Sequence, residues 1–355
     1  MSARFRLPTK MRGWLQSTGS QAGRTGTPPL PALEEKLAPI FQLWHQFDSS
    51  SKQWTPLDRA LISGSTVPCP PQDANFVLVT WNVEAFSPAP RDRIAAIISH
   101  IQNLVPAVDI IFLQEVSRPA LLALLSTPWL RDHWYSSEAD TTSWGQQAFA
   151  SMTLLSKSRF GDALGPIWRV RFPSRFERDA LCCDLFLSSA SADAAPSPAD
   201  AVSSESPPQQ ETRIRLVNVH LDSLALQPSF RPRQLSIIAA YLRAAGRGLV
   251  AGDFNPVLPE DEMLVSANRL VDAWCELHPD DPGFTWGVDG KAPFPPNRLD
   301  KVAMVGLKAS EIQVMPPGIM PADAVPEQEQ KYGRDMPLRW SDHHGLVCCF
   351  SIGGQ

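Results

Sequence analysis

Six short polar clusters each lie at one end of an apolar, strand-like run in this 355-residue chain. They are TWNVE (80–84), LQEV (113–116), NVHLD (218–222), GDFN (252–255), RLD (298–300) and SDHHG (341–345). A sheet carries the side chains at the ends of its strands to one rim, so clusters placed in this way can meet in the folded protein. Neither a hydrophobic core nor a solvated surface requires such repetition.

Strand-like and helix-like segments alternate around these clusters. Apolar and β-branched runs predict strands at 76–80, 109–113, 152–155, 181–187, 214–219, 248–251, 301–305 and 346–352. Apolar residues at helical spacing predict helices at 91–104, 118–125 and 232–245. This alternation predicts a mixed α/β (α+β) domain over 76–352, in which two mixed β-sheets pack together and helices flank them.

The segment before this domain divides into two parts. Residues 1–31 carry basic side chains and no acidic one, so we expect a disordered basic tail; a mitochondrial targeting segment is the alternative. We expect residues 32–75 to form an N-terminal extension that packs on the domain. Leu33, Leu37, Ile40, Phe41 and Trp44 have helical spacing, which favours a helix there.

Residues 188–212 interrupt the domain with a different composition. The stretch holds seven serines and four prolines, and it has too little apolar surface to offset the entropy lost on ordering. Because strand-like runs flank it, we expect a disordered insertion inside a hairpin rather than a domain boundary.

Composition excludes several classes of protein. With 43% hydrophobic residues and a net charge of −5, the chain is globular and carries no global signature of nucleic-acid binding. No apolar run is long enough for a membrane span. The spacing of the six cysteines favours reduced thiols. We therefore expect an intracellular protein, nuclear or cytoplasmic, without a membrane segment and monomeric.

The acidic residues of the clusters require a cation if they meet. Glu84, Glu115, Asp253 and Asp342 would repel one another unless positive charge lay among them. Oxygen ligands favour a hard ion, so we expect Mg²⁺, with Mn²⁺ as the substitute. No Cys or multi-His cluster accompanies these residues, which disfavours zinc.

The remaining polar residues supply what carboxylates cannot. His220 and His343 can donate hydrogen bonds to an anionic oxygen. Asn82 and Asn255 can orient a water or a phosphoryl oxygen. Together with a hard cation, these groups favour metal-assisted hydrolysis of a phosphate ester.

The order TWN, LQE, NVHLD, GDFN, RLD, SDHHGL resembles the endonuclease/exonuclease/phosphatase superfamily over 76–352. The resemblance implies a four-layered αββα sandwich and Mg²⁺-dependent phosphoesterase activity. It implies that Glu115 is the principal metal ligand, with Asp342 and Glu84 on the metal side and Asn82 nearby. Glu84 stands where many members carry Asp.

The same resemblance implies roles for the other cluster residues. Asp253 and Asn255 would position or deprotonate the attacking water. His343, oriented by Asp300, would contact the scissile phosphate, and His220 would hydrogen-bond a non-bridging oxygen. Asp253 and His343 both remain candidates for the general base.

Finer features are similar to the tyrosyl-DNA phosphodiesterase 2 branch, which acts in DNA repair. They are FPS (172–174), Arg178 with the following ALC, FTW (284–286) and the form SDHxGL. This resemblance implies a nucleic-acid partner, a DNA 5′ end that can be linked to protein, and substrate contacts by Arg178 and Trp286.

The chain departs from that branch at three positions beside the clusters. His344, Phe254 and Asp222 stand where the branch has Trp, Thr and Glu. The alternatives are therefore an abasic-site endonuclease, an RNA deadenylase, a small-molecule phosphatase or, in another class, a non-catalytic scaffold.

Overall fold

The computed structural model describes residues 38–57, 75–188, 211–290, 292, 294–321 and 337–352. The tail predicted at 1–31 and most of the insertion predicted at 188–212 lie outside these residues. Strands hold the outermost residues of that predicted insertion, because β9 (Asp179–Ser188) ends and β10 (Glu211–His220) begins within it.

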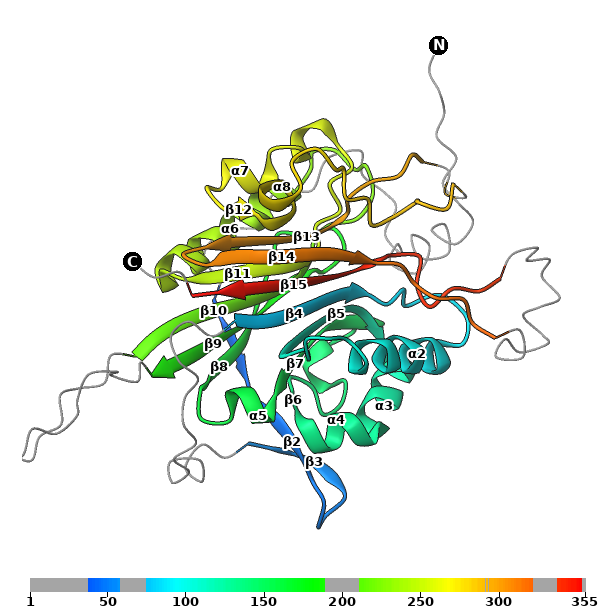
Figure 1. Cartoon of the computed structure of the whole chain (residues 1–355), viewed down its shortest axis with the longest axis vertical. Coiled ribbons are helices and arrows are strands. Elements are labelled where there is room, and N and C mark those ends of the chain that lie inside the picture. Colours follow the sequence, from blue (N-terminus) through cyan, green and yellow to red (C-terminus); the bar gives the residue numbers. More distant parts are fainter. Residues whose placement is uncertain are drawn as a thin grey trace, which may run out of the picture. The chain divides into compact units, whose positions relative to one another are not determined.

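Two mixed β-sheets form the centre of the fold (Figure 1). One sheet has the order β1 (Ile40–Gln42), β8 (Leu164–Arg171), β9, β10, β11 (Gly248–Asp253), β13 (Asp300–Val305) and β12 (Val271–Asp272). The other has the order β14 (Lys308–Met315), β15 (Gly345–Ser351), β4 (Asn75–Asn82), β5 (Ile110–Ser117), β7 (Phe149–Ser156), β6 (Trp134–Ser136), β2 (His45–Asp48) and β3 (Gln53–Pro56). We call them the seven-stranded and eight-stranded sheets after their described strands.

Helices cover the outer faces of the sheets, as predicted (Figure 1). The eight-stranded sheet carries α2 (Pro90–Gln102), α3 (Arg118–Ser126) and α4 (Pro128–His133). The seven-stranded sheet carries α6 (Arg231–Ala245) and α7 (Leu264–Ala267). The other described helical segments are α5 (Lys157–Phe160), α8 (Ala273–Leu277) and the 3-10 turns Thr142–Trp144 and Pro259–Asp261.

Alternation along the strands separates the core into layers. In β4, Phe76 and Leu78 face the space between the sheets, whereas Val77 and Val79 pack against the outer helices. The strands β10, β11 and β13 follow the same rule. The expectation of two packed mixed sheets flanked by helices is confirmed.

The helix predicted in the N-terminal extension is wrong for the residues of that segment that the structure describes. Residues 40–56 form the strands β1, β2 and β3. Strand β1 pairs with β8, and β2 pairs with β6, so these segments lie at sheet edges. Trp44 is buried and its Nε1 donates a hydrogen bond to the Gly165 carbonyl at 3.2 Å. Pairing with an open sheet edge therefore outweighs local helical spacing.

Two long strands were not predicted. Strand β8 contains Gly165 and Pro166, residues that are uncommon in strands. Strand β14 exposes several polar and charged side chains, so it lacks a simple apolar pattern. Among the described residues, no helix is both long and apolar enough to cross a bilayer.

Candidate active site

Three polar side chains of the seven-stranded sheet lie beside one another across adjacent strands. His220 ends β10, Asp253 ends β11 and Asp300 begins β13. The register pairs His220 with Asp253 and Asp253 with Asp300. Each lies an even number of residues from apolar side chains that face the other sheet, so all three point toward the space between the sheets.

The eight-stranded sheet contributes Asn82 and Glu115 to the same place. Asn82 Nδ2 lies 3.0 Å from Asp253 Oδ2 and 3.3 Å from Glu115 Oε1. Glu115 Oε2 accepts a hydrogen bond from the Ala85 amide at 2.9 Å. His220 Nε2 lies 3.8 Å from Glu115 Oε1. The side-chain amide of Asn82 therefore joins the polar ends of the two sheets. We refer to the side chains gathered here, with His343, as the cluster.

A β-bulge gives Glu115 its direction. The register of β5 against β7 shifts between Leu113 and Val116. Leu113 packs in the outer core, and strict alternation would turn Glu115 the same way. The bulge places Glu115 at φ 58° and turns its carboxylate toward the cluster.

Two further site residues share this left-handed backbone conformation. Glu84 has φ 55° and Asn255 has φ 48°. Each such residue costs on the order of 1–3 kcal/mol, and such strain is concentrated at functional sites. At Glu84, Glu115 and Asn255, this backbone conformation directs side chains from three strand ends into one site.

His343 forms a buried ion pair with Asp300. Its Nδ1 lies 2.8 Å from Asp300 Oδ2, and its Nε2 lies 4.0 Å from Asp253 Oδ2. Burial alone would lower the pKa of His343, but the carboxylates of Asp300 and Asp253 raise it well above its ordinary value. Its surroundings therefore favour the protonated form of His343.

His220 has the opposite electrostatics. Burial lowers its pKa well below the ordinary value, and the positive charges of Arg178 and His343 lower it further. Its Nε2 lies 3.4 Å from Asp253 Oδ2, and its ring stacks on Phe149. The surroundings of the two histidines thus favour opposite forms, neutral for His220 and protonated for His343.

Asp253 is the carboxylate in the middle of the cluster. Burial raises its pKa to about 7; the charge on His343 opposes the rise, while Asp300 and Glu115 add to it. Its Oδ1 accepts a hydrogen bond from the Asn255 amide at 3.0 Å. Its other oxygen, Oδ2, faces Asn82, His220 and His343.

Glu84 and Asp342 lie together beside this group. Glu84 Oε2 accepts a hydrogen bond from the Asp342 amide at 3.1 Å, and its Oε1 accepts one from Ser87 Oγ at 2.7 Å. Arg93 Nη1 lies 3.8 Å from Glu84 Oε2. Trp286 Nε1 donates to Asp342 Oδ2 at 3.3 Å.

The donor set fits a hard divalent cation. Asp253, Asp300 and His343 offer ligand atoms within 4.8 Å of one another, but Asp300 and His343 already bind each other. Glu115 and Asp253 are bridged by Asn82, and cationic charge among them would restore the ionised form of Asp253. The oxygen donors therefore suit Mg²⁺ or Mn²⁺.

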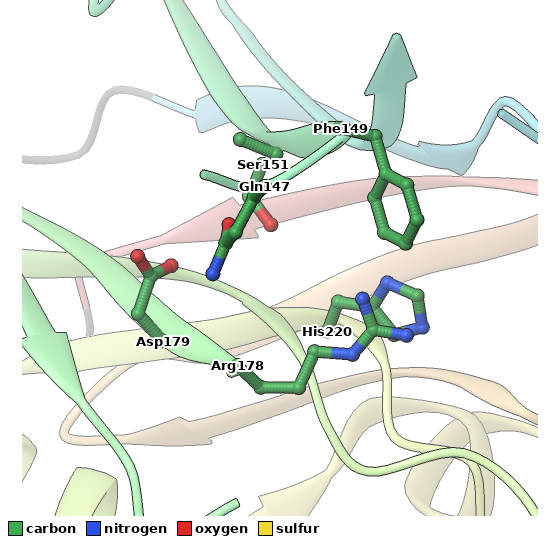
Figure 2. A pocket seen from close by; sticks show the side chains of 7 residues that line it. Gln147, Phe149, Ser151, Arg178, Asp179 and His220 are labelled. Carbon is green, nitrogen blue, oxygen red and sulfur yellow. The ribbon is translucent and has the colours of Figure 1, made fainter. Parts of the chain in front are cut away.

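Arg178 and Trp286 flank the cluster next to different residues. Arg178 Nη2 donates to Ser223 Oγ at 3.1 Å, and its guanidinium lies 5.0 Å from the centre of the Phe149 ring. Arg178, Phe149 and His220 line a pocket (Figure 2). Trp286 instead lies beside Asp342, and its backbone forms a bridge with His343.

Sequence reasoning missed the residues that hold the cluster in place. Ser341 Oγ donates to the Asn82 carbonyl at 2.6 Å. Thr285 Oγ1 accepts from the Asp300 amide at 3.0 Å, and Trp81 Nε1 donates to the His343 carbonyl at 3.1 Å. Trp81 and Ser341 belong to the polar clusters, but their contacts span more than 250 positions of sequence and leave no local signal.

The three departures from the branch pattern lie in different surroundings. Phe254 is fully buried in the core layer under α6, away from the space between the sheets. Asp222 accepts hydrogen bonds from Gln234 Nε2 at 2.8 Å and from the Arg175 amide at 3.1 Å. The His344 amide donates to the Thr285 carbonyl at 2.7 Å. The large Phe254 side chain therefore leaves the cluster unobstructed.

The sequence matches the Endonuclease/Exonuclease/phosphatase family over residues 79–343, well over half of the chain. The chain belongs to that family. No curated protein matches the chain. Its two packed mixed sheets with outer helices are consistent with the sandwich fold of this family of phosphoesterases.

Solved structures share the fold at low sequence identity. A humanized D. rerio TDP2 is 17% identical with a TM-score of 0.55, and the match covers 78% of this chain and 99% of that chain. D. rerio TDP2 complexed with single strand DNA product is 17% identical with a TM-score of 0.52, covering 79% and 100%. Sphingomyelinase C from Streptomyces griseocarneus is 15% identical with a TM-score of 0.50, covering 78% and 99%.

Proposed function

We propose that this protein is a Mg²⁺-dependent phosphodiester hydrolase that removes tyrosyl groups from DNA 5′ ends. The observation that carries the hydrolase assignment is the juxtaposition of Asp253 with the His343–Asp300 pair and with Glu115 at the joined ends of two sheets. A buried base, an imidazolium and a group of oxygen donors at one site are the components of phosphate-ester hydrolysis.

Glu115, Asp342 and Glu84 would hold the metal ion, with Asn82 beside them. Glu115 directs a carboxylate toward the cluster, and Glu84 holds the backbone amide of Asp342. When bound, the cation supplies positive charge that polarises the phosphate and neutralises these carboxylates. Mn²⁺ would serve as the substitute.

Asp253 would act as the general base. Its Oδ1 is held by the Asn255 amide, which leaves Oδ2 to accept the proton of an attacking water. Burial raises its pKa to about 7, and a cation at the site would favour the ionised form, which can accept that proton. The Asn255 side chain lies at the same strand end and would help to position the water.

His343 would donate to the phosphate rather than accept a proton. Its Nδ1 is paired with Asp300, so Nε2 is the nitrogen free to donate to a phosphoryl oxygen. The raised pKa of His343, caused by Asp300 and Asp253 against the effect of burial, keeps this nitrogen protonated. Both observations support Asp253 as the general base and His343 as the group that stabilises developing charge.

His220 and Arg178 would bind the other phosphate oxygens. The Ser223 hydroxyl lies 3.1 Å from Arg178 Nη2 and 3.5 Å from His220 Nε2, so both donors converge on one place. Trp286, on the side of Asp342, would contact a sugar or base. We infer that the substrate crosses the cluster from Trp286 to Arg178.

Two observations support a nucleic-acid end as the substrate. The motifs of this chain resemble the tyrosyl-DNA phosphodiesterase 2 branch, and one structure that shares the fold holds a single strand DNA product. The fold is also that of a sphingomyelinase C. The alternatives remain an abasic-site endonuclease, an RNA deadenylase, a small-molecule phosphatase and a non-catalytic scaffold.

The test is cleavage of a 5′-phosphotyrosyl DNA oligonucleotide beside an abasic duplex and an oligoadenylate RNA, with and without Mg²⁺. Asp253→Asn removes the basic carboxylate with little change in side-chain shape. The matched control is Glu276→Gln, which makes the same carboxylate-to-amide change at an exposed position in α8. We expect tyrosine release by the wild type and the control, with a loss of about 10²-fold or more in Asp253→Asn.

The other outcomes separate the alternatives. Cleavage of only the abasic duplex or the RNA would retain the hydrolase mechanism and exclude the tyrosyl-DNA assignment. Failure to cleave any of the three substrates with Mg²⁺ or Mn²⁺ would favour the small-molecule phosphatase or the scaffold.

A further inference from the structure

A buried ionic network lies behind the pocket that His220 and Arg178 line. Arg169 in β8 donates from Nη1 to both oxygens of Asp179, at 3.0 and 3.1 Å. Its Nη2 donates to Glu138 Oε1 at 2.6 Å and to the Ser151 carbonyl at 2.9 Å. Glu138 and the guanidinium are almost fully buried. None of these groups takes part in the proposed chemistry.

The N-terminal strand β1 completes this network. Gln42 Oε1 accepts a hydrogen bond from Arg169 Nε at 3.1 Å. Gln42 Nε2 donates to the Ser137 carbonyl at 2.7 Å and to Glu138 Oε1 at 3.3 Å. Every nitrogen of the Arg169 guanidinium therefore has a partner, and one partner, Gln42, comes from the segment that precedes the six polar clusters.

Arg169 joins the two walls of the pocket. Ser151 belongs to β7 of the eight-stranded sheet, and Asp179 belongs to β9 of the seven-stranded sheet. Both line the pocket, Ser151 two residues after Phe149 and Asp179 directly after Arg178 (Figure 2). The separation of these two walls determines where Arg178 and Phe149 lie relative to His220.

The ionic network around Arg169 is expected to contribute little net stability to the fold. Burying an arginine and two carboxylates carries a large desolvation cost, and apolar residues can often replace buried ion pairs without loss of stability. The planar guanidinium directs Nε, Nη1 and Nη2 to Gln42, Asp179 and Glu138 in three fixed directions, which the single ammonium group of a lysine cannot reproduce. The network therefore specifies geometry between the sheets more than it stabilises the fold.

We propose that Arg169, held by Gln42, is a positioning residue that fixes the spacing of the two pocket walls and so sets the affinity for substrate. This proposal rests on the proposed hydrolase function and deepens it. Arg169 touches neither the phosphate nor the metal ligands; it acts through Asp179 and Ser151 on the two sides of the pocket.

Arg169→Lys and Gln42→Ala test the proposal, with Arg215→Lys as the matched control. Arg215 makes a buried bidentate ion pair with Asp184, at 2.7 Å to each oxygen, within the same sheet but outside the pocket lining. We expect both network variants to raise KM on the order of tenfold and to leave kcat within about twofold, because substrate binding is displaced and the base is not. Arg215→Lys should keep the wild-type KM.

Hydrogen exchange gives a readout that does not depend on activity. In both network variants, amide protection of 147–151 and 178–180 should fall, whereas Arg215→Lys should leave these segments protected. Wild-type KM and wild-type protection in Arg169→Lys and Gln42→Ala would overturn the proposal, as would an equal KM rise in Arg215→Lys. A wild type that hydrolyses no phosphodiester would instead reject the proposed function, and the exchange pattern would still decide the role of Arg169.

Discussion

Asp253 and Asp300 lie directly opposite each other on the antiparallel strands β11 and β13, and the His343 imidazole bridges them. Two like charges in register destabilise a sheet unless a cation lies between them. His343 supplies that positive charge, because its two ring nitrogens face the two carboxylates. The arrangement separates their roles, since Asp300 holds the imidazolium and Asp253 keeps an oxygen for the reaction.

Asp300→Asn should abolish most activity and leave the fold intact. The amide removes the charge that keeps His343 protonated, so the imidazole loses its ability to stabilise developing negative charge. We expect kcat to fall by about 10²-fold or more with a nearly unchanged KM. Steady-state kinetics with the exposed Asp280→Asn as control checks this. A kcat within a few-fold of the wild type would exclude the orienting role.

Millimolar Mg²⁺ should raise the melting temperature, and Glu115→Gln should remove the effect. A ligand present at 100 times its Kd stabilises the folded state by about 2.7 kcal/mol. Glu115→Gln keeps the side-chain volume and removes the charge that the cation requires. Thermal melts with EDTA, Mg²⁺ and the Glu276→Gln control provide the measurement. An equal Mg²⁺-dependent shift in Glu115→Gln would show that the ion binds elsewhere.

Gly252→Ala should prevent stable folding. Gly252 has φ 136°, and an added Cβ would lie 2.0 Å from the Val219 carbonyl oxygen in the neighbouring strand. Gly145→Ala is the matched control, because Gly145 also has a positive φ, 65°, but open space around it. We expect the control to lose about 1–3 kcal/mol from backbone strain alone. Comparable denaturation midpoints for the two variants would contradict the close approach of β10 and β11.

Lys301→Met should stabilise the protein at neutral pH. Burial and, to a smaller extent, the charge of Arg298 lower the pKa of Lys301 to about 8, so the folded state disfavours the ammonium form. Removing this group should raise the free energy of unfolding by about 3 kcal/mol at pH 7.

This stabilisation should shrink as the pH rises. Between pH 8 and 10.5 the unfolded state binds more protons than the folded state, so the wild type gains stability with pH and approaches Lys301→Met. Urea titrations of both proteins at pH 7 and pH 10 measure the difference. A gap of equal size at the two pH values would contradict the depressed pKa.

Much of the fold followed from local patterns. The runs at 76–80, 109–113, 214–219 and 248–251 became β4, β5, β10 and β11 because they are apolar, β-rich and buried on both faces. The strands β8 and β14 did not follow, nor did the strands of the N-terminal extension. Their conformation depends on hydrogen bonds to an existing sheet edge rather than on their own side chains.

The sequence by itself determined which side chains are available for chemistry, because the polar clusters end their strands and the strands are defined by local apolar patterns. Tertiary structure decided what each group can do. The bulge in β5 turns Glu115 inward. The register of β11 and β13 places Asp253 opposite Asp300, and the alternation of β11 directs Phe254 away from the cluster. Protonation states likewise arise only when residues distant in sequence share one buried space, since burial and neighbouring charge set each pKa.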